Sequence, residues 1–168
     1  MVVEPAGRKL VLTTHVIASV GWLGAVIAFL ALAVVGLTSQ DPKTVRALYI
    51  AAEPLTWFVI VPLALASLLT GIAQSLVTSW GLFRHYWVLF KFLIAVIATI
   101  VLLVYTPTVG FFARLAAGSG DNLSDLRAPT FMLHSGAALI LLLAATVLAI
   151  FKPRGLTPYG WHVARKAS

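Results

Sequence analysis

Four long apolar stretches constrain the fold of this chain more than any other feature of its sequence. They cover about residues 10–37, 55–79, 86–106 and 129–151. About 20 apolar residues in a helix cross the hydrocarbon core of a membrane. Open strands leave backbone groups unpaired in lipid, and the stretches lack the alternation of a membrane β-barrel. The sequence therefore predicts an all-α fold, an integral membrane four-helix bundle that forms a single transmembrane domain over residues 1–168.

The composition supports this class and excludes several others. Charged residues make up 10% of the chain, against roughly 25% in soluble globular domains. The chain has no cysteine, which excludes thiolate zinc sites, iron–sulfur clusters and cysteine nucleophiles. The first stretch is longer than the apolar core of a signal peptide, so we expect it to be a retained span.

The distribution of charge predicts the orientation in the membrane. An even number of spans places both termini on one side, here named side A, and the opposite side is named side B. Side A holds eight basic residues and one acidic residue, whereas side B holds four of each. Because Lys and Arg accumulate on cytoplasmic loops, we expect both termini in the cytoplasm. The net charge of +7 then reflects this topology and anionic lipid, and nucleic acid is not an expected partner.

The connections between the spans also contain residues that predict local structure. Asp41 followed by Pro42 predicts an N-cap and the first turn of a helix that continues into the second span. Pro54 and Pro62 should bend that helix. The short connection at 80–85 makes the second and third spans antiparallel neighbours, and residues 118–122 predict a flexible turn.

Three polar residues inside the spans are expected to lie at one depth. His15, Gln74 and Lys91 come from the first three spans, and each lies roughly 6–8 Å from side A at about 1.5 Å per residue. Ser19 and Trp22 share the helical face of His15. Polar residues inside a membrane are candidates for function. The pattern predicts a polar pocket that opens toward side A and contains Ser19, Gln74 and Lys91.

Structural interpretations of the same residues stay open. Lys91 can extend its ammonium group to the headgroups. The second span carries a polar stripe that can serve to pack helices together, formed by Ser67, Gly71, Gln74 and Thr78. His15 can donate a hydrogen bond to a neighbouring carbonyl without binding any ligand.

His134 lies about five residues inside side B, where Glu53 and Tyr105 can approach it. Its separation from His15 along the membrane normal is roughly 16 Å. One iron or metal ion therefore cannot join the two histidines. His85 lies at the side A interface, where it is either a second ligand or an interfacial anchor.

Parts of the sequence resemble a group of bacterial proteins. The chain reads HVIASVGWLG over residues 15–24, YWVLFK over 86–91 and KPRG over 152–155. These strings are similar to small bacterial four-helix integral membrane proteins of unknown function. The resemblance implies a multi-pass protein of the bacterial inner (plasma) membrane.

A second resemblance rests on five residues. His15 is followed by Trp22 and Gly24, and a later span holds Trp87 and Lys91. This pattern is similar to bacterial-type membrane protoporphyrinogen oxidases and to the copper-resistance D-type membrane domain. The resemblance to the oxidases implies a haem b ligand at His15 and a functional lysine at Lys91.

We therefore consider first a membrane protein that binds haem b and passes electrons to quinone or oxygen. Haem needs an axial histidine, room between helices and cations for its propionates. His15 supplies the ligand. Gly21 and Gly24 supply room, and Arg84 or Lys91 supplies charge. A second ligand at His85, or a second haem at His134, stays open. The candidate cofactor-binding residues are His15, Trp22, Gly24, Arg84, His85, Lys91 and His134, and the candidate metal ligands among them are His15, His85 and His134.

Two alternatives come from other functional classes. A transporter of small solutes or ions would line its path with Gln74 and Lys91, and four helices would require a homo-oligomer to form a pore. A non-catalytic accessory or scaffold subunit of a membrane complex would instead use the small residues Gly21 and Gly24 to pack against its partners.

Overall fold

The computed structural model describes residues 4–78, 80–118 and 123–167, and these residues form helices without any strand. Four of the helical stretches are long and apolar enough to cross a membrane, which makes the chain a multi-pass membrane protein by length and composition. The elements are α1 (Pro5–Thr38), α2 (Pro42–Leu55), the π-helical turn η1 (Thr56–Ile60), α3 (Val61–Val77), α4 (Tyr86–Ala117), the 3-10 turn η2 (Ser124–Leu126), α5 (Thr130–Phe151) and α6 (Pro158–Ala167).

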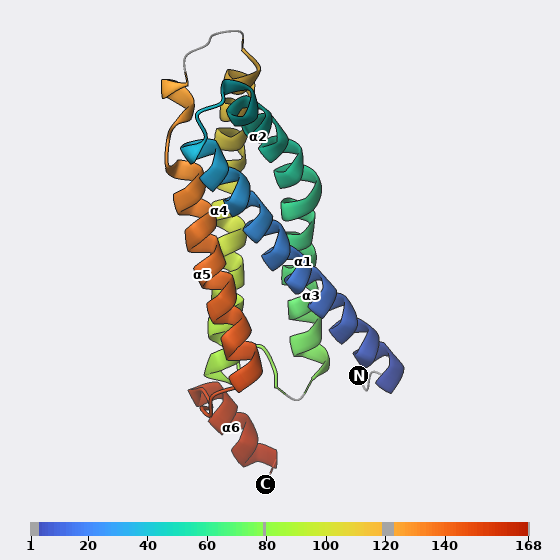
Figure 1. Ribbon diagram of the computed structural model, residues 1–168. Coiled ribbons are helices and arrows are strands. Elements are labelled where there is room, and N and C mark those ends of the chain that lie inside the picture. The colour runs from blue at the N-terminus through green and yellow to red at the C-terminus, as the bar shows by residue number, and fades with distance from the viewer. Residues whose placement is uncertain (1–3, 79, 119–122, 168) are drawn as a thin grey trace.

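The long helices form one bundle in which α1 crosses the others at an angle (Figure 1). Helix α1 packs against α3, α2 and α5, and α4 packs against α2, α5 and α3. Both ends of the chain lie at the same end of the bundle, as an even number of spans requires. At that end the first half of α1 diverges from α5, whereas the two helices converge toward side B.

The tightest packing lies near side B and is aromatic. Phe131 of α5 lies 5.3 Å from Phe29, 5.0 Å from Tyr49 and 5.3 Å from Phe112, measured between ring centroids. The Tyr49 hydroxyl donates a hydrogen bond to the carbonyl of Leu126. This cluster joins α1, α2, α4 and α5, and it leaves the side A end of the bundle as the more open end.

Helix α5 begins and ends close to the fourth predicted span, whereas α1 begins at Pro5, ahead of the predicted start at about residue 10, and the second and third helical stretches are longer than predicted. Helical structure runs without interruption from Pro42 to Val77, and α4 extends to Ala117, beyond the predicted end at residue 106. The extension of α4 contains Pro107. It stays helical because Val109 and Ala113 are buried in the bundle, and α4 packs along α2. Residue 79 and residues 119–122 of the predicted turn lie outside the described residues.

A π-helical turn follows Pro54, where the sequence predicts a bend. Proline lacks an N–H and cannot continue the regular hydrogen-bond ladder. The turn Thr56–Ile60 follows directly, and the N–H of Thr56 is shared between the carbonyls of Ala52 and Glu53. Such turns occur frequently at functional sites, and Thr56 and Ile60 line a cavity described below.

The predicted N-cap at Asp41 is present, and it makes a pH-dependent contribution to stability. The Asp41 carboxylate accepts hydrogen bonds from the Thr44 hydroxyl (2.5 Å) and from the backbone N–H of Thr44 (3.0 Å). These hydrogen bonds lower the pKa of Asp41. A depressed carboxyl pKa stabilises the fold above the unfolded value of about 3.9 and loses that contribution as pH falls through the folded value. Asp41→Ala should therefore lower Tm at pH 7, and the difference from wild type should shrink below about pH 4.

Thermal unfolding in detergent at both pH values checks this prediction. Asp125→Ala is a matched control, because Asp125 lies at side B and caps no long helix. Equal Tm values for wild type and Asp41→Ala at pH 7 would contradict it.

Candidate functional site

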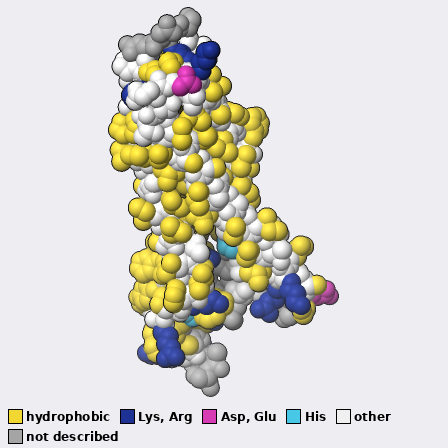
Figure 2. Space-filling view, viewed as in Figure 1, with side chains coloured by type: hydrophobic (Ala, Val, Ile, Leu, Met, Phe, Trp, Pro, Cys, Tyr) yellow, Lys and Arg dark blue, Asp and Glu magenta, His cyan; other side chains and the backbone are white. Residues whose placement is uncertain are grey.

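A cavity of about 380 Å³ lies among α1, α3, α4 and α5 in the half of the bundle nearer side A. We name it the polar cavity. Figure 2 shows a hollow at this end of the molecule, with His and Lys or Arg side chains at its edges. The structure brings His15, Ser19, Gln74 and Lys91 together in its wall, as their common depth predicts. Its other polar and aromatic lining residues are Ser67, Ser75, Thr78, Thr146, Trp22, Trp80 and Trp87.

The orientation of His15 is fixed by α3. Its Nδ1 atom lies 3.1 Å from the carbonyl oxygen of Ser67 and 3.1 Å from Oγ1 of Thr70. The Thr70 hydroxyl already donates to the carbonyl of Ala66 at 2.5 Å, and the Ser67 carbonyl can only accept. Nδ1 must therefore carry the proton, which leaves a lone pair on Nε2. Within the described residues Nε2 has no hydrogen-bond partner.

Close approach of α3 makes this contact possible. A Cβ atom placed on Gly71 would lie 3.1 Å from Cε1 of His15, so a larger residue there would require the imidazole to move by a few tenths of an ångström. The hydroxyls of Ser19 and Ser67 share a hydrogen bond of 2.8 Å between the same two helices. Part of the polar stripe on α3 therefore packs against α1, in line with the structural interpretation of that stripe.

Gln74 and Lys91 present polar atoms that the described residues do not satisfy. Oε1 of Gln74 is buried and has no hydrogen-bond partner among the described residues. Lys91 lines the cavity from α4, and the described residues offer it neither a hydrogen bond nor a salt bridge. A buried polar group without a partner costs about 1–3 kcal/mol. With Nε2 of His15, these atoms form an unsatisfied polar set in one cavity, as a ligand site requires.

Trp22 separates the polar cavity from a second cavity of about 230 Å³, named here the apolar cavity. The Trp22 side chain is 3% exposed and lines both cavities.

Gly24 does not contribute the room expected of it, because it is exposed and a Cβ there would meet no atom within 4 Å. Gly21 instead packs against Leu63 of α3. Trp22 and Gly24 are two residues apart and therefore lie on different faces of α1, so Gly24 faces away from the bundle interior.

His134 lines the apolar cavity and not the polar one. Its Nδ1 atom lies 2.9 Å from the carbonyl of Thr130, and its ring stacks on Tyr105 at 3.9 Å between centroids. The expected approach of Tyr105 is thus present. Glu53 lies elsewhere, against Gly110 of α4. His15 and His134 therefore occupy separate cavities, in line with the distance predicted between them.

The remaining predicted residues lie in the connection between α3 and α4. His85 is the N-cap residue of α4, and its Nδ1 atom lies 2.8 Å from the carbonyl of Trp80. The backbone carbonyl of Arg84 accepts a hydrogen bond from the N–H of Thr157. Neither residue lines the polar cavity.

The predicted metal ligands do not converge. Across the described part of the chain, no three His, Cys, Asp or Glu side chains gather where they could hold a metal ion. His15 and His134 come from different helices and His85 from the connection between α3 and α4, and of the three only His15 lines the polar cavity. A cofactor that needs one protein ligand remains compatible with this geometry.

Sequence reasoning missed the partners of His15. Ser67, Gly71 and Gln74 are visible as a stripe at helical spacing, but the sequence does not say that His15 lies on that stripe. Thr70 is a helical neighbour of Ser67 by its spacing in the sequence. This spacing is the feature from which Thr70 could have been predicted to share the face that contacts His15. No family model, curated protein or solved structure matches this chain.

Proposed function

We propose that this membrane protein binds haem b in the polar cavity, with His15 as the axial ligand. The orientation of the His15 imidazole carries the proposal. Histidines that bind a metal through one nitrogen usually donate the other N–H to a carbonyl or carboxylate, which fixes the tautomer and the ring. His15 has this arrangement toward Ser67, and it lines a cavity large enough to admit a ligand.

The rest of the donor set fits the polar edge of haem. Lys91 offers a positive charge to a propionate, and the Gln74 carboxamide can donate to a propionate or accept from its protonated form. Trp22 and Trp87 offer aromatic surface to the flat ring. Bound haem would supply one-electron chemistry, with quinone or oxygen as the proposed electron partner.

Different residues of this chain have different roles in binding haem. His15 holds the iron, and the Ser67 carbonyl orients His15 and raises its basicity. Lys91 balances the charge of a propionate. Since His85 and His134 lie outside the polar cavity, we propose a single histidine ligand.

The absorption spectrum of the protein purified in mild detergent, after expression with added haem, tests the proposal. We expect a Soret band that shifts on reduction with dithionite and shifts again with carbon monoxide, because the second axial position carries no histidine. A colourless preparation that stays colourless after haem is supplied overturns the proposal.

Gly71→Ala should weaken haem binding roughly tenfold, the lower end of the range for disturbed outer-shell contacts of a metal ligand. The added Cβ would lie 3.1 Å from Cε1 of His15 and would move the imidazole from its place. Gly24→Ala is the matched control, because the same change there meets open space. Titration of haem into detergent-purified apoprotein measures the haem affinity of both variants. Equal affinities for the two variants would be incompatible with the proposed ligand.

The orientation and location belong to the same proposal. We infer that both termini face the cytoplasm of a bacterial cell and that the protein lies in the inner membrane. Support comes from the cations Arg8, Lys9, Lys152, Arg154, Arg165 and Lys166, which belong to the chain segments that meet at side A (Figure 2). A fluorescent protein fused to the C-terminus should fold and fluoresce, whereas a periplasmic phosphatase fused there should be inactive. The reverse result contradicts the orientation.

A further inference from the structure

The apolar cavity has a buried inner end and an exposed outer end. Trp22, Ile60 and Val109 line its inner end and are at most 3% exposed. Two other lining residues, Val101 of α4 and Leu141 of α5, are 47% and 36% exposed. Both belong to candidate membrane spans, so this outer end faces the region that lipid chains occupy. The apolar cavity therefore opens toward the bilayer beside α4 and α5, which pack together.

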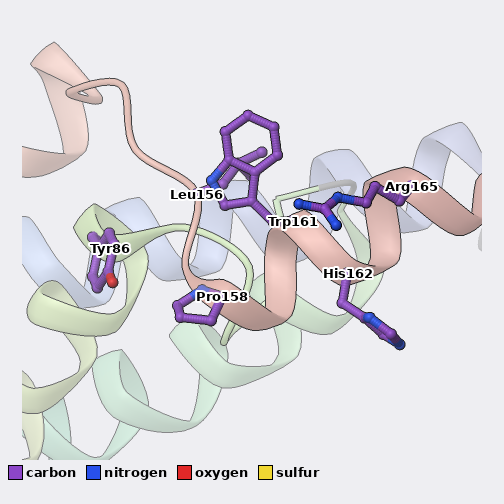
Figure 3. A pocket seen from close by; sticks show the side chains of 6 residues that line it. All are labelled: Tyr86, Leu156, Pro158, Trp161, His162 and Arg165. Atoms are coloured by element: carbon purple, nitrogen blue, oxygen red, sulfur yellow. The ribbon is translucent and has the colours of Figure 1, made fainter.

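The larger hollow beside α6 is a more open site. It measures about 570 Å³ and lies between α6 and the start of α4 (Figure 3). Tyr86 and Trp161 in its wall are 43% and 56% exposed. Figure 3 shows Trp161 and His162 leaving α6 in different directions. The apolar cavity is therefore the more enclosed candidate for a ligand site.

His134 gives the apolar cavity a hydrogen-bond acceptor. Its Nδ1 atom lies 2.9 Å from the carbonyl oxygen of Thr130, and a carbonyl can only accept. Nδ1 therefore carries the proton, and Nε2 presents a lone pair. Among the residues that the structure describes, the hydrogen bonds of this ring all involve Nδ1. The stacking on Tyr105 holds the plane of the imidazole, so His134 offers Nε2 to a ligand that can donate.

Two buried hydroxyl groups in the wall are acceptors as well. The Thr56 hydroxyl donates to the carbonyl of Ala52 at 2.7 Å, and the Ser135 hydroxyl donates to the carbonyl of Phe131 at 2.6 Å. Each hydroxyl has one proton, so both oxygens keep only lone pairs for a ligand. Thr56 also belongs to the π-helical turn η1, a type of turn that is frequent at functional sites. These side chains favour a ligand that donates a hydrogen bond.

The size of the apolar cavity limits the ligand further. Its volume of about 230 Å³ is below the roughly 300–1,000 Å³ of sites for drug-sized molecules, so it suits a single substituted ring. An acyl chain could fill the apolar space, but it would leave Nε2 of His134 without a donor. A ring that carries a hydroxyl group meets both requirements.

We propose that the apolar cavity binds the ring of a hydroquinone, the reduced form of a lipid-soluble quinone. One ring hydroxyl donates to Nε2 of His134, and the apolar tail extends past α4 and α5 into the bilayer. The oxidised quinone has carbonyl groups that cannot donate, so it should bind less tightly. The redox role of this ligand rests on the proposed function, because Trp22 lines both cavities and lies between the hydroquinone and the proposed haem. Binding of the hydroquinone itself does not require haem.

Equilibrium dialysis of the haem-free, full-length protein in detergent under nitrogen tests the site, with protein-free micelles as the reference. The probes are trimethylhydroquinone and its dimethyl ether, which share one ring, but only the first donates a hydrogen bond. Wild type should bind the hydroquinone about tenfold more tightly than the ether, the effect of one hydrogen bond. Equal binding of the two probes would fit a purely apolar occupant such as an acyl chain, and it overturns the proposal.

His134→Phe removes Nε2 and keeps a ring beside Tyr105. This variant should bind the hydroquinone only as tightly as wild type binds the ether. Because His134 is exposed on α5, the bundle should tolerate the change, and far-UV circular dichroism in detergent checks that it does. An unchanged preference for the hydroquinone in His134→Phe overturns the assignment of Nε2 as the acceptor.

Two substitutions in α5 separate this site from the proposed haem site. Ala138 lines the apolar cavity, and Ala145, seven residues later, lines the polar cavity. Ala138→Leu should abolish hydroquinone binding because the larger side chain fills the apolar cavity, whereas Ala145→Leu should leave it unchanged. The Tm of each variant in detergent establishes that it stays folded. An equal loss of hydroquinone binding in both variants overturns the proposal.

The two proposals can fail separately. Dialysis of the haem-free protein depends on His134, whereas the Soret band depends on His15. A hydroquinone that does not bind overturns this inference and leaves haem binding in place. Normal hydroquinone binding by a protein that never gains a Soret band supports the site in the apolar cavity and overturns the haem proposal alone.

Discussion

His15→Ala should remove the Soret band from the purified protein while the protein still inserts into the membrane. His15 is the one histidine of the described residues that lines the polar cavity. Disturbing an outer-shell partner of a metal ligand typically costs 10–100-fold in affinity, so loss of the ligand itself should exceed about 100-fold. The measurement is haem titration of the apoprotein, followed at the Soret maximum.

The fold should tolerate this change. His15 is only partly buried, and its removal leaves the Ser67 carbonyl within α3 and the Ser19–Ser67 hydrogen bond in place. Imidazole added in solution should enter the space left by the side chain and restore part of the Soret band. Such rescue separates loss of a ligand from loss of structure.

Two other histidines serve as controls. His134→Ala alters the apolar cavity and His85→Ala alters the cap of α4, and both variants should keep the Soret band. Full haem binding by His15→Ala, or its loss in His134→Ala alone, would show that the ligand lies elsewhere.

The helices and the common depth of the polar residues could be predicted because both depend on position along the chain. Apolar length identifies a span, and rise per residue converts sequence position into depth. His15, Gln74 and Lys91 therefore meet where their distances from the span ends place them. The cap at Asp41 could be predicted as well, because Pro42 and Thr44, which help to form it, directly follow it in the sequence.

The rotation of each helix about its own axis could not be predicted in the same way. In a membrane both lipid and neighbouring helices are apolar, so hydrophobic pattern does not mark the inward face. Gly24 faces outward whereas Gly21 packs against α3, and the hydrophobic pattern does not distinguish the two glycines. The length of α4 was underestimated for a related reason, because packing against α2 outweighs the proline that interrupts its apolar run.

Phe131→Ala should have the largest effect on stability, a loss of about 3–5 kcal/mol in the free energy of unfolding. Phe131 is 3% exposed and contacts aromatic rings of α1, α2 and α4. Lipid does not reach this side chain, so its removal leaves a void that forfeits packing contacts on several helices. Unfolding in mixed micelles of mild detergent and dodecyl sulfate measures the loss. Phe58→Ala is the control, since Phe58 is 80% exposed and lies where lipid would contact it.

The same variant separates the stability of the bundle from ligand binding. Phe131 packs near side B, close to Tyr105 at 6.1 Å between ring centroids, whereas the polar cavity lies in the half nearer side A. The folded fraction of Phe131→Ala should therefore bind haem with the affinity of wild type, although it unfolds more readily. A loss below about 1 kcal/mol would mean that the helices close over the void. A parallel loss of haem affinity would mean instead that the aromatic cluster holds α1 in the position that His15 requires.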